Sequence, residues 1–135
     1  MGTIYVARSL KLSKWASDVG LSKHVYKLGV TDEKVKPLLE AARWAGEDDW
    51  ALVRQDDAGG LSEEEVLTRI GRKEKAVDPR YYPRIKDAVG IFKVDPVHVE
   101  SHLIVGRALD GTAERVAIKL KPADFASYLI HNALR

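Results

Sequence analysis

The sequence predicts an α+β fold in which a small central sheet, mixed or antiparallel, has helices packed on it. Segments rich in β-branched and aromatic residues alternate along the chain with segments whose apolar residues recur at helical spacing. The 135 residues are enough to bury one core, and they contain no internal repeat, low-complexity tract or convincing linker. We therefore expect a single domain over residues 1–135.

Composition narrows the functional classes. The chain has no cysteine, which excludes disulfides and thiolate sites and makes the cytoplasm the expected location. No stretch approaches the roughly 18 apolar residues of a membrane span. The net charge of +2 does not by itself argue for a polyanionic partner. Nucleotide hydrolysis and serine hydrolysis are disfavoured, because Gly59-Gly60 lacks the rest of a P-loop and no G-x-S-x-G elbow is present.

Two strands are predicted near the start of the chain. Thr3–Arg8 and residues 25–30 are both rich in β-branched and aromatic side chains. The connection between them, residues 10–23, is long and basic, and we expect one short helical turn in it before Gly20.

A short helix and a third strand should follow. Lys36-Pro37 places a proline near the helix start, and Gly46 lies just beyond its expected end. The third strand is predicted over residues 50–55, after an acidic turn.

The clearest helix start lies at residues 61–66. Ser62 can cap the helix, Glu65 can close a capping box, and Leu61 can contact Val66 as a hydrophobic staple. Apolar residues continue at helical spacing, at Val66, Leu67, Ile70 and Val77. Asp78-Pro79 and Tyr82-Pro83 then break regular structure before a buried strand predicted over residues 90–94.

The C-terminal part predicts a β-hairpin and a helix. Asp95-Pro96 can open a helix, but the apolar residues between 97 and 105 alternate more cleanly than they repeat at helical spacing, so a strand is preferred. Asp110-Gly111 is a favoured tight turn, and residues 116–120 alternate again. Pro122–Leu134 has the apolar stripe of a docking helix.

Two short motifs carry a resemblance to a known family. They are Gly2-Thr3-Ile4-Tyr5 and Tyr26-Lys27-Leu28-Gly29, on the first two predicted strands. The segment 2–94 resembles the GIY-YIG nuclease superfamily, in which the two named tripeptides lie on adjacent strands and a helix follows. Here Thr3 interrupts the first motif, and Lys27-Leu28 separates Tyr26 from Gly29. The expected hairpin and helix, residues 95–135, lie outside the resemblance.

The resemblance implies hydrolysis of a phosphodiester with Mg²⁺ or Mn²⁺. Its tyrosines fall on Tyr5 and Tyr26, and its metal-binding glutamate falls on a later helix. The family's first helix should carry an arginine whose guanidinium binds phosphate through two parallel hydrogen bonds. The corresponding position here is Lys36, and Arg43 follows seven residues later. Lysine supplies a positive charge but not this bidentate hydrogen bonding.

Spacing selects the glutamate. Glu63 shares the helix face of Val66, Leu67 and Ile70, so it is the predicted metal ligand, and Glu74 is the alternative. Each of these residues can instead have a purely structural role. Tyrosines in strands usually pack in the core, and acidic residues in a first helical turn usually complement the helix dipole.

A second constellation consists of His98, Glu100 and His102. On a strand these three side chains share one face, as two imidazoles and a carboxylate around a metal would. A solvated polar face is the preferred interpretation.

Basic residues interleave with aromatic residues in two segments, which predicts a track for nucleic-acid phosphates. The candidates are Lys11, Lys14, Trp15, Lys23, Lys27, Arg69, Arg72, Lys73, Arg80 and Arg84. Nearby acidic residues weaken the positive electrostatic potential of these segments.

The predicted function is therefore a divergent GIY-YIG-like protein that binds nucleic acid, DNA rather than RNA, with metal-dependent cleavage as its activity if catalysis is retained. The alternative is a non-enzymatic interaction module that binds a partner protein or a second copy of the chain through the C-terminal hairpin or helix. No membrane partner is expected.

Overall fold

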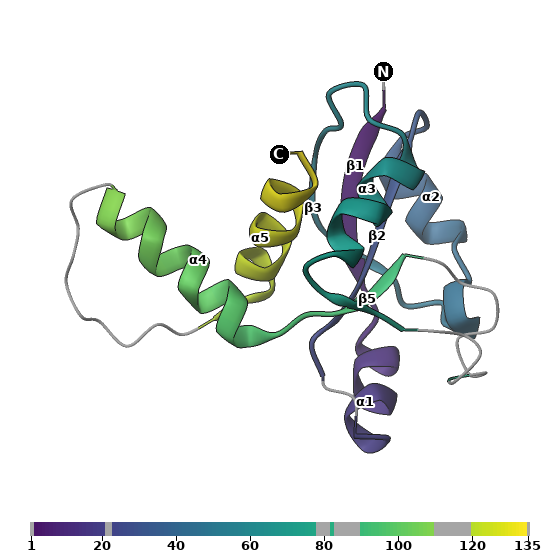
Figure 1. Ribbon diagram of the computed structural model, residues 1–135. Coiled ribbons are helices and arrows are strands. Elements are labelled where there is room, and N and C mark those ends of the chain that lie inside the picture. The colour runs from purple at the N-terminus through teal and green to yellow at the C-terminus, as the bar shows by residue number, and fades with distance from the viewer. Residues whose placement is uncertain (1, 21–22, 78–81, 83–89, 110–119, 135) are drawn as a thin grey trace.

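The architecture is a five-stranded sheet with helices on both faces, which confirms the α+β class (Figure 1). The computed structural model describes residues 2–20, 23–77, 82, 90–109 and 120–134, with the side chains of 106–109 left out. Within these residues, no helix is long and apolar enough to cross a bilayer.

The sheet is antiparallel throughout and has the order β3-β1-β2-β5-β4. Its strands are β1 (Thr3–Arg8), β2 (Val25–Thr31), β3 (Ala51–Asp57), β4 (Lys75–Ala76) and β5 (Ile91–Lys93). Tyr5 lies directly opposite Gly29 in the β1–β2 register. The two strands with the sequence motifs are therefore neighbours at the centre of the sheet.

One face of the sheet is covered by α1 (Leu10–Asp18) and α2 (Val35–Ala41). Ser9 caps α1, because its hydroxyl accepts from Leu12 N at 3.1 Å and also donates to Asp49. The short 3₁₀ helix η1 (Trp44–Gly46) follows α2. The core on this face includes Tyr5, Leu12, Val35, Leu39 and Trp50.

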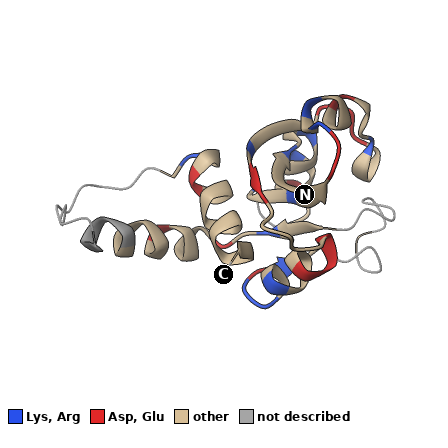
Figure 2. Cartoon of the chain, turned by 90° about the horizontal axis from the view of Figure 1, so that it is seen from above, with Lys and Arg blue, Asp and Glu red and all other residues tan. Residues whose placement is uncertain are grey.

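The opposite face is covered by α3 (Glu63–Gly71) and α5 (Pro122–Leu134). Ile4, Val6 and Leu28 from the sheet pack there against Val66 and Ile70 of α3 and Phe125 and Leu129 of α5. The helix α4 (Pro96–Leu109) contributes Val99 to this core. Its far end projects away from the sheet in both views (Figures 1 and 2).

The predicted strand at residues 97–105 is wrong, because this segment is α4. Asp95 N-caps the helix by accepting from Val97 N at 2.9 Å, and Pro96 occupies the first helical position. The alternating apolar pattern wrongly predicted one buried strand face. In the helix only Val99 of these valines is buried, whereas Val97 and Val105 are exposed. The second strand of the predicted hairpin, with its Asp110-Gly111 turn, lies almost entirely outside the described residues.

Two other segments differ from expectation. The predicted single turn before Gly20 is the nine-residue helix α1. The capped helix begins as predicted, with Ser62 Oγ accepting from Glu65 N at 3.2 Å, but it ends at Gly71. Val77 lies beyond β4 and belongs to the core on the other face.

Candidate functional site

Tyr5 and Glu63 meet at Gly29, with the ammonium of Lys27 5.9 Å from the Tyr5 ring centroid, and we call this the Gly29 site. A Cβ added at Gly29 would lie 2.7 Å from Glu63 Oε1 and closer still to the Tyr5 hydroxyl oxygen. Since these distances are shorter than any real Cβ contact, the glycine lets the phenol and the carboxylate approach the strand and one another.

Glu63 reaches the site from the side of β2 that faces β5. On that side Leu28 N donates to Gly90 O at 2.8 Å, and the next amide, Val30 N–H, has no strand partner among the residues that the structure describes. Glu63 Oε1 accepts from that amide at 3.2 Å. The helix start at Ser62 fixes this position, because it makes Glu63 the first residue of α3.

Lys27 provides a buried positive charge beside the pair. Lys27 is 3% exposed, and its Nζ donates to Leu28 O at 2.9 Å. Nζ also lies 4.8 Å from the ring centroid of Trp44, which stacks on Tyr5 at 5.9 Å. Burial lowers the pKa of the Lys27 ammonium to about 8, although the Glu63 carboxylate acts in the opposite direction.

The Tyr5 hydroxyl is held in its protonated form. Burial raises the pKa of this phenol, and the Glu63 carboxylate raises it further. The hydroxyl makes no hydrogen bond with any other described residue, and no fully buried polar side-chain atom of these residues lacks a partner. It therefore keeps some solvent contact, and at neutral pH it acts as a hydrogen-bond donor and not as a base.

Tyr26 does not join Tyr5, contrary to the expected clustering on one sheet face. It lies in the core on the opposite face and stacks on Phe125 of α5 at 5.3 Å. Burial raises its pKa to about 12, against a lowering effect of Arg8. The strand alternation causes this separation, since Tyr26 is three residues from Gly29 and its side chain points the other way.

The two cationic candidates on and after α2 are also elsewhere. Arg43 Nη1 donates to Glu40 O at 3.2 Å and to Ala42 O at 2.8 Å, so its guanidinium satisfies carbonyls at the end of α2. Lys36 is exposed and makes no described contact with Tyr5 or Glu63. Lys27 is the basic residue that the structure brings to the site.

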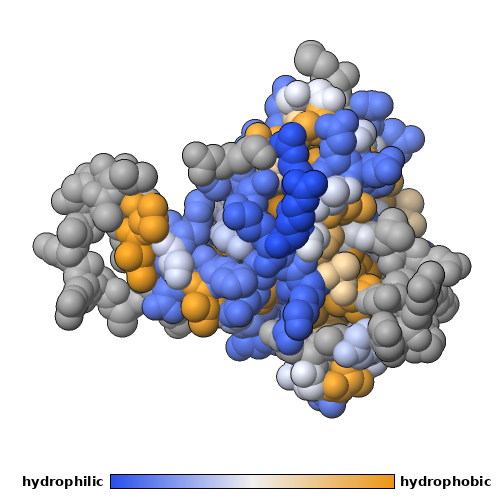
Figure 3. Space-filling model, in the orientation of Figure 1, coloured by the Kyte–Doolittle hydropathy of each residue, from blue (hydrophilic) through white to orange (hydrophobic). Residues whose placement is uncertain are grey.

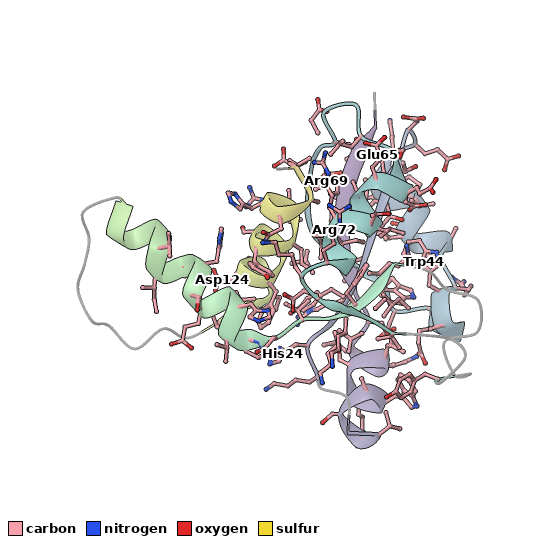
Figure 4. All side chains as sticks on the ribbon, in the orientation of Figure 1. His24, Trp44, Glu65, Arg69, Arg72 and Asp124 are labelled. Atoms are coloured by element: carbon pink, nitrogen blue, oxygen red, sulfur yellow. The ribbon has the colours of Figure 1, made fainter. Side chains whose placement is uncertain are left out.

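The expected phosphate track is dispersed. Lys11 pairs with Asp48 at 3.2 Å, and Trp15 contacts Tyr82 edge to face. Arg69, which donates to Ala133 O at 3.0 Å, and Arg72 lie on one side of the molecule (Figure 4), where a band of hydrophilic residues crosses α3 (Figure 3). Lys14, Lys23 and Lys73 are exposed, and Arg80 and Arg84 lie outside the described residues.

The helix α3 begins with acidic residues and ends with basic ones. Glu63, Glu64 and Glu65 form the first turn of α3, and Arg69 lies in its last turn (Figure 2). This order complements the helix dipole, so part of the charge pattern has a structural role.

The second constellation is not a metal site. On α4, residues two apart point in different directions, so His98, Glu100 and His102 do not converge. Among the described residues, no group of three histidine or acidic side chains is placed to hold a metal. His98 instead binds Glu74, and His102 contacts the rings of Tyr128 and His131.

Sequence reasoning missed Trp44 and the role of Glu74. Trp44 stacks on Tyr5, and the next residue, Ala45 in η1, has a φ of 57°, a left-handed conformation that alanine does not predict. Glu74 was considered only as a metal ligand. Because α3 ends at Gly71, helical spacing from Ile70 does not predict the burial of Glu74.

Comparison with known proteins does not identify the chain. No protein-family model matches it, and neither curated proteins nor solved structures gave a match.

Proposed function

We propose that this chain is a divergent GIY-YIG-like protein that binds nucleic acid, DNA rather than RNA, at the Gly29 site and cleaves its phosphodiester with a divalent metal. The observation that carries the proposal is the convergence of the Tyr5 hydroxyl and the Glu63 carboxylate over Gly29. A protonated phenol and a carboxylate at one point can orient water and hold a cation.

The donor set fits Mg²⁺ or Mn²⁺. Glu63 Oε1 accepts from Val30, and Oε2 makes no hydrogen bond with any other described residue. Mg²⁺ is commonly held by one or two carboxylates together with water and substrate phosphates. When bound, such an ion polarises a phosphoryl oxygen and neutralises developing charge.

Lys27 supports the proposal by replacing the missing arginine electrostatically. Its ammonium is largely charged at pH 7, because its pKa is about 8. A fixed positive charge in a buried position attracts phosphate more strongly than a solvated one. Above pH 8 this attraction should fade as Nζ loses its proton. A cytoplasmic location, argued from the absence of cysteine, is part of the proposal.

The experiment measures binding and cleavage of labelled single-stranded and duplex DNA and RNA across a salt series, with and without Mg²⁺ or Mn²⁺. Glu63→Gln should abolish metal-dependent cleavage and leave most of the binding. Glu64→Gln is the matched control, because Glu64 is an exposed neighbour in the same helical turn. Cleavage that survives Glu63→Gln, or an absence of binding at low salt, would overturn the proposal.

A second candidate is a protein-interaction module, favoured by the exposed apolar residues of α4. Val97, Ile104 and Val105 are 63%, 51% and 59% exposed and lie on one helical stripe. The occupant we consider is a second copy of the chain. Sedimentation should then show a dimer that Ile104→Ser/Val105→Ser disrupts and Leu10→Ser, an equally exposed control on α1, does not.

A further inference from the structure

A pocket of about 340 Å³ lies between β4, β5 and the start of α4, on residues that the Gly29 site does not use. Its polar lining consists of Lys73, Glu74, Lys75, Lys93, Asp95 and His98. We call it the lysine pocket.

Two of its lysines face each other directly. Lys75 of β4 and Lys93 of β5 are partners in the antiparallel register, so their side chains leave the same face of the sheet side by side. Like charges in directly opposed positions destabilise a strand pair. Neither lysine, nor Lys73, makes an ion pair with a described residue. A negatively charged ligand between them would remove this repulsion.

The nearest buried carboxylate is already saturated. The side chain of Glu74 is 2% exposed. Its Oε1 accepts from Asp95 N at 2.8 Å, and its Oε2 lies 2.7 Å from both the Tyr128 hydroxyl and His98 Nδ1. Glu74 therefore orients His98 and makes no ion pair with the three lysines.

His98 presents its other nitrogen to the pocket. The ring is 48% exposed, and Nε2 lies 3.9 Å from Asp95 Oδ2. With Nδ1–H directed at Glu74, a neutral ring has only an acceptor at Nε2, whereas a protonated ring has a donor there. The hydrogen bond that His98 donates to Glu74 raises the pKa of His98, and the negative charges of Glu74 and Asp95 raise it further, whereas partial burial and Lys73 lower it.

The pocket is positive in either state. Its three lysines outnumber Glu74 and Asp95 by one charge when His98 is neutral and by two when His98 is protonated. The groups that face His98 from every neighbouring element are Glu74, Asp95, Tyr128 and the lysines.

We propose that the lysine pocket binds a phosphate group, which Lys75 and Lys93 hold between them, and that protonated His98 adds a hydrogen bond from Nε2. Lys73 extends the same positive surface toward the end of α3. The inference does not depend on cleavage at the Gly29 site, because the two sites share no residue.

The first probe is sulfate, because its charge does not change between pH 6 and pH 8. Sulfate is titrated against chloride at constant ionic strength while NMR follows the His98 imidazole signals, with the other three histidines of the chain as internal references. We expect selective shifts at His98 and at the backbone amides of residues 93–95, which precede Pro96. The sulfate affinity should fall roughly tenfold as the pH rises through the raised pKa of His98, because a charge-assisted hydrogen bond is lost.

Three variants test the assignment. Lys75→Gln/Lys93→Gln should lose sulfate binding, whereas Lys34→Gln/Lys121→Gln, which removes two exposed lysines elsewhere, should keep it. The Lys75→Gln/Lys93→Gln variant should also unfold at a higher temperature than the parent without sulfate, since repulsion is removed. His98→Gln should bind sulfate with little dependence on pH.

Inorganic phosphate and a short oligonucleotide then separate the sources of the ligand. Stronger binding of the oligonucleotide, lost in Lys75→Gln/Lys93→Gln, assigns the pocket to a backbone phosphate. Binding of inorganic phosphate alone assigns it to a free or terminal phosphate. Sulfate shifts no larger than those of chloride, or shifts that persist in Lys75→Gln/Lys93→Gln, would overturn the proposal, and a pH dependence that persists in His98→Gln would overturn the role of His98.

Discussion

At the scale of single residues, Lys27 is the least expected feature of the core. A lysine ammonium is strongly hydrated, and burying it carries a free-energy cost that one hydrogen bond to Leu28 O and the face of Trp44 only partly offset. A side chain that served packing alone would be apolar. The buried charge is therefore an argument for a functional requirement at the Gly29 site.

The stability of the protein should rise with pH because of Lys27. The pKa of its ammonium falls from 10.5 to about 8 on folding, so between these values the unfolded chain binds more protons than the folded one. The free energy of unfolding should increase over this range by up to about 3 kcal/mol. Urea unfolding at pH 7 to 10 measures this, with Lys27→Met as the reference for all other titrating groups. An equal pH dependence in parent and Lys27→Met would contradict the buried charge.

Gly29 should not tolerate a side chain. Gly29→Ala places a methyl group against the Tyr5 hydroxyl and Glu63 Oε1, so we expect a loss of about 1–3 kcal/mol in the free energy of unfolding and displacement of both groups. Gly71→Ala is the control, because a Cβ there meets nothing within 4 Å and alanine favours the helix. Chemical denaturation compares the two, and equal stabilities would show that Gly29 is not crowded.

At the scale of elements, features that depend on residues close in sequence could be predicted, whereas contacts between distant segments could not. The start of α3 was evident from Ser62, because a cap depends on residues three positions apart. The hydrogen bond from Val30 N–H to Glu63 depends on where β5 begins to pair with β2, which the sequence pattern does not encode. The separation of Tyr5 from Tyr26 follows from strand alternation, and it was predictable once Tyr5 was paired with Gly29.

The helix α4 shows how a cap can outweigh an apolar pattern. Asp95 and Pro96 are a strong helix start, whereas the alternation of residues 97–105 reflects apolar residues that remain exposed. Asp95→Ala should therefore lower the free energy of unfolding by about 1 kcal/mol, and Asp95→Asn, which keeps a capping oxygen, by less. Urea titration followed by circular dichroism checks this. A loss no greater for alanine than for asparagine would show that the cap is not what starts α4.

At the scale of the whole molecule, the C-terminal region is part of the core and not an addition to it. Phe125 and Leu129 of α5 are 2% and 0% exposed, and they pack on Ile4, Val6 and Leu28 from the sheet. Tyr128 is also tied to Glu74, which joins α5 to the segment after α3. The resemblance to the GIY-YIG superfamily covers residues 2–94, whereas the hydrophobic core also includes residues of α4 and α5.

A chain that ends at residue 94 should therefore fail to fold. Losing α5 uncovers the apolar face of β1 and β2, and a domain is stable by only roughly 5–15 kcal/mol, so we expect the shortened chain to be unfolded. In the full chain, Leu129→Ala should cost about 2–5 kcal/mol, whereas Ala123→Ser, at an exposed position of α5, should cost little. Circular dichroism and amide hydrogen exchange measure both effects. If residues 1–94 alone unfold cooperatively with protected strand amides, α5 covers a core that is already complete, and the two-part division suggested by the resemblance is the better description.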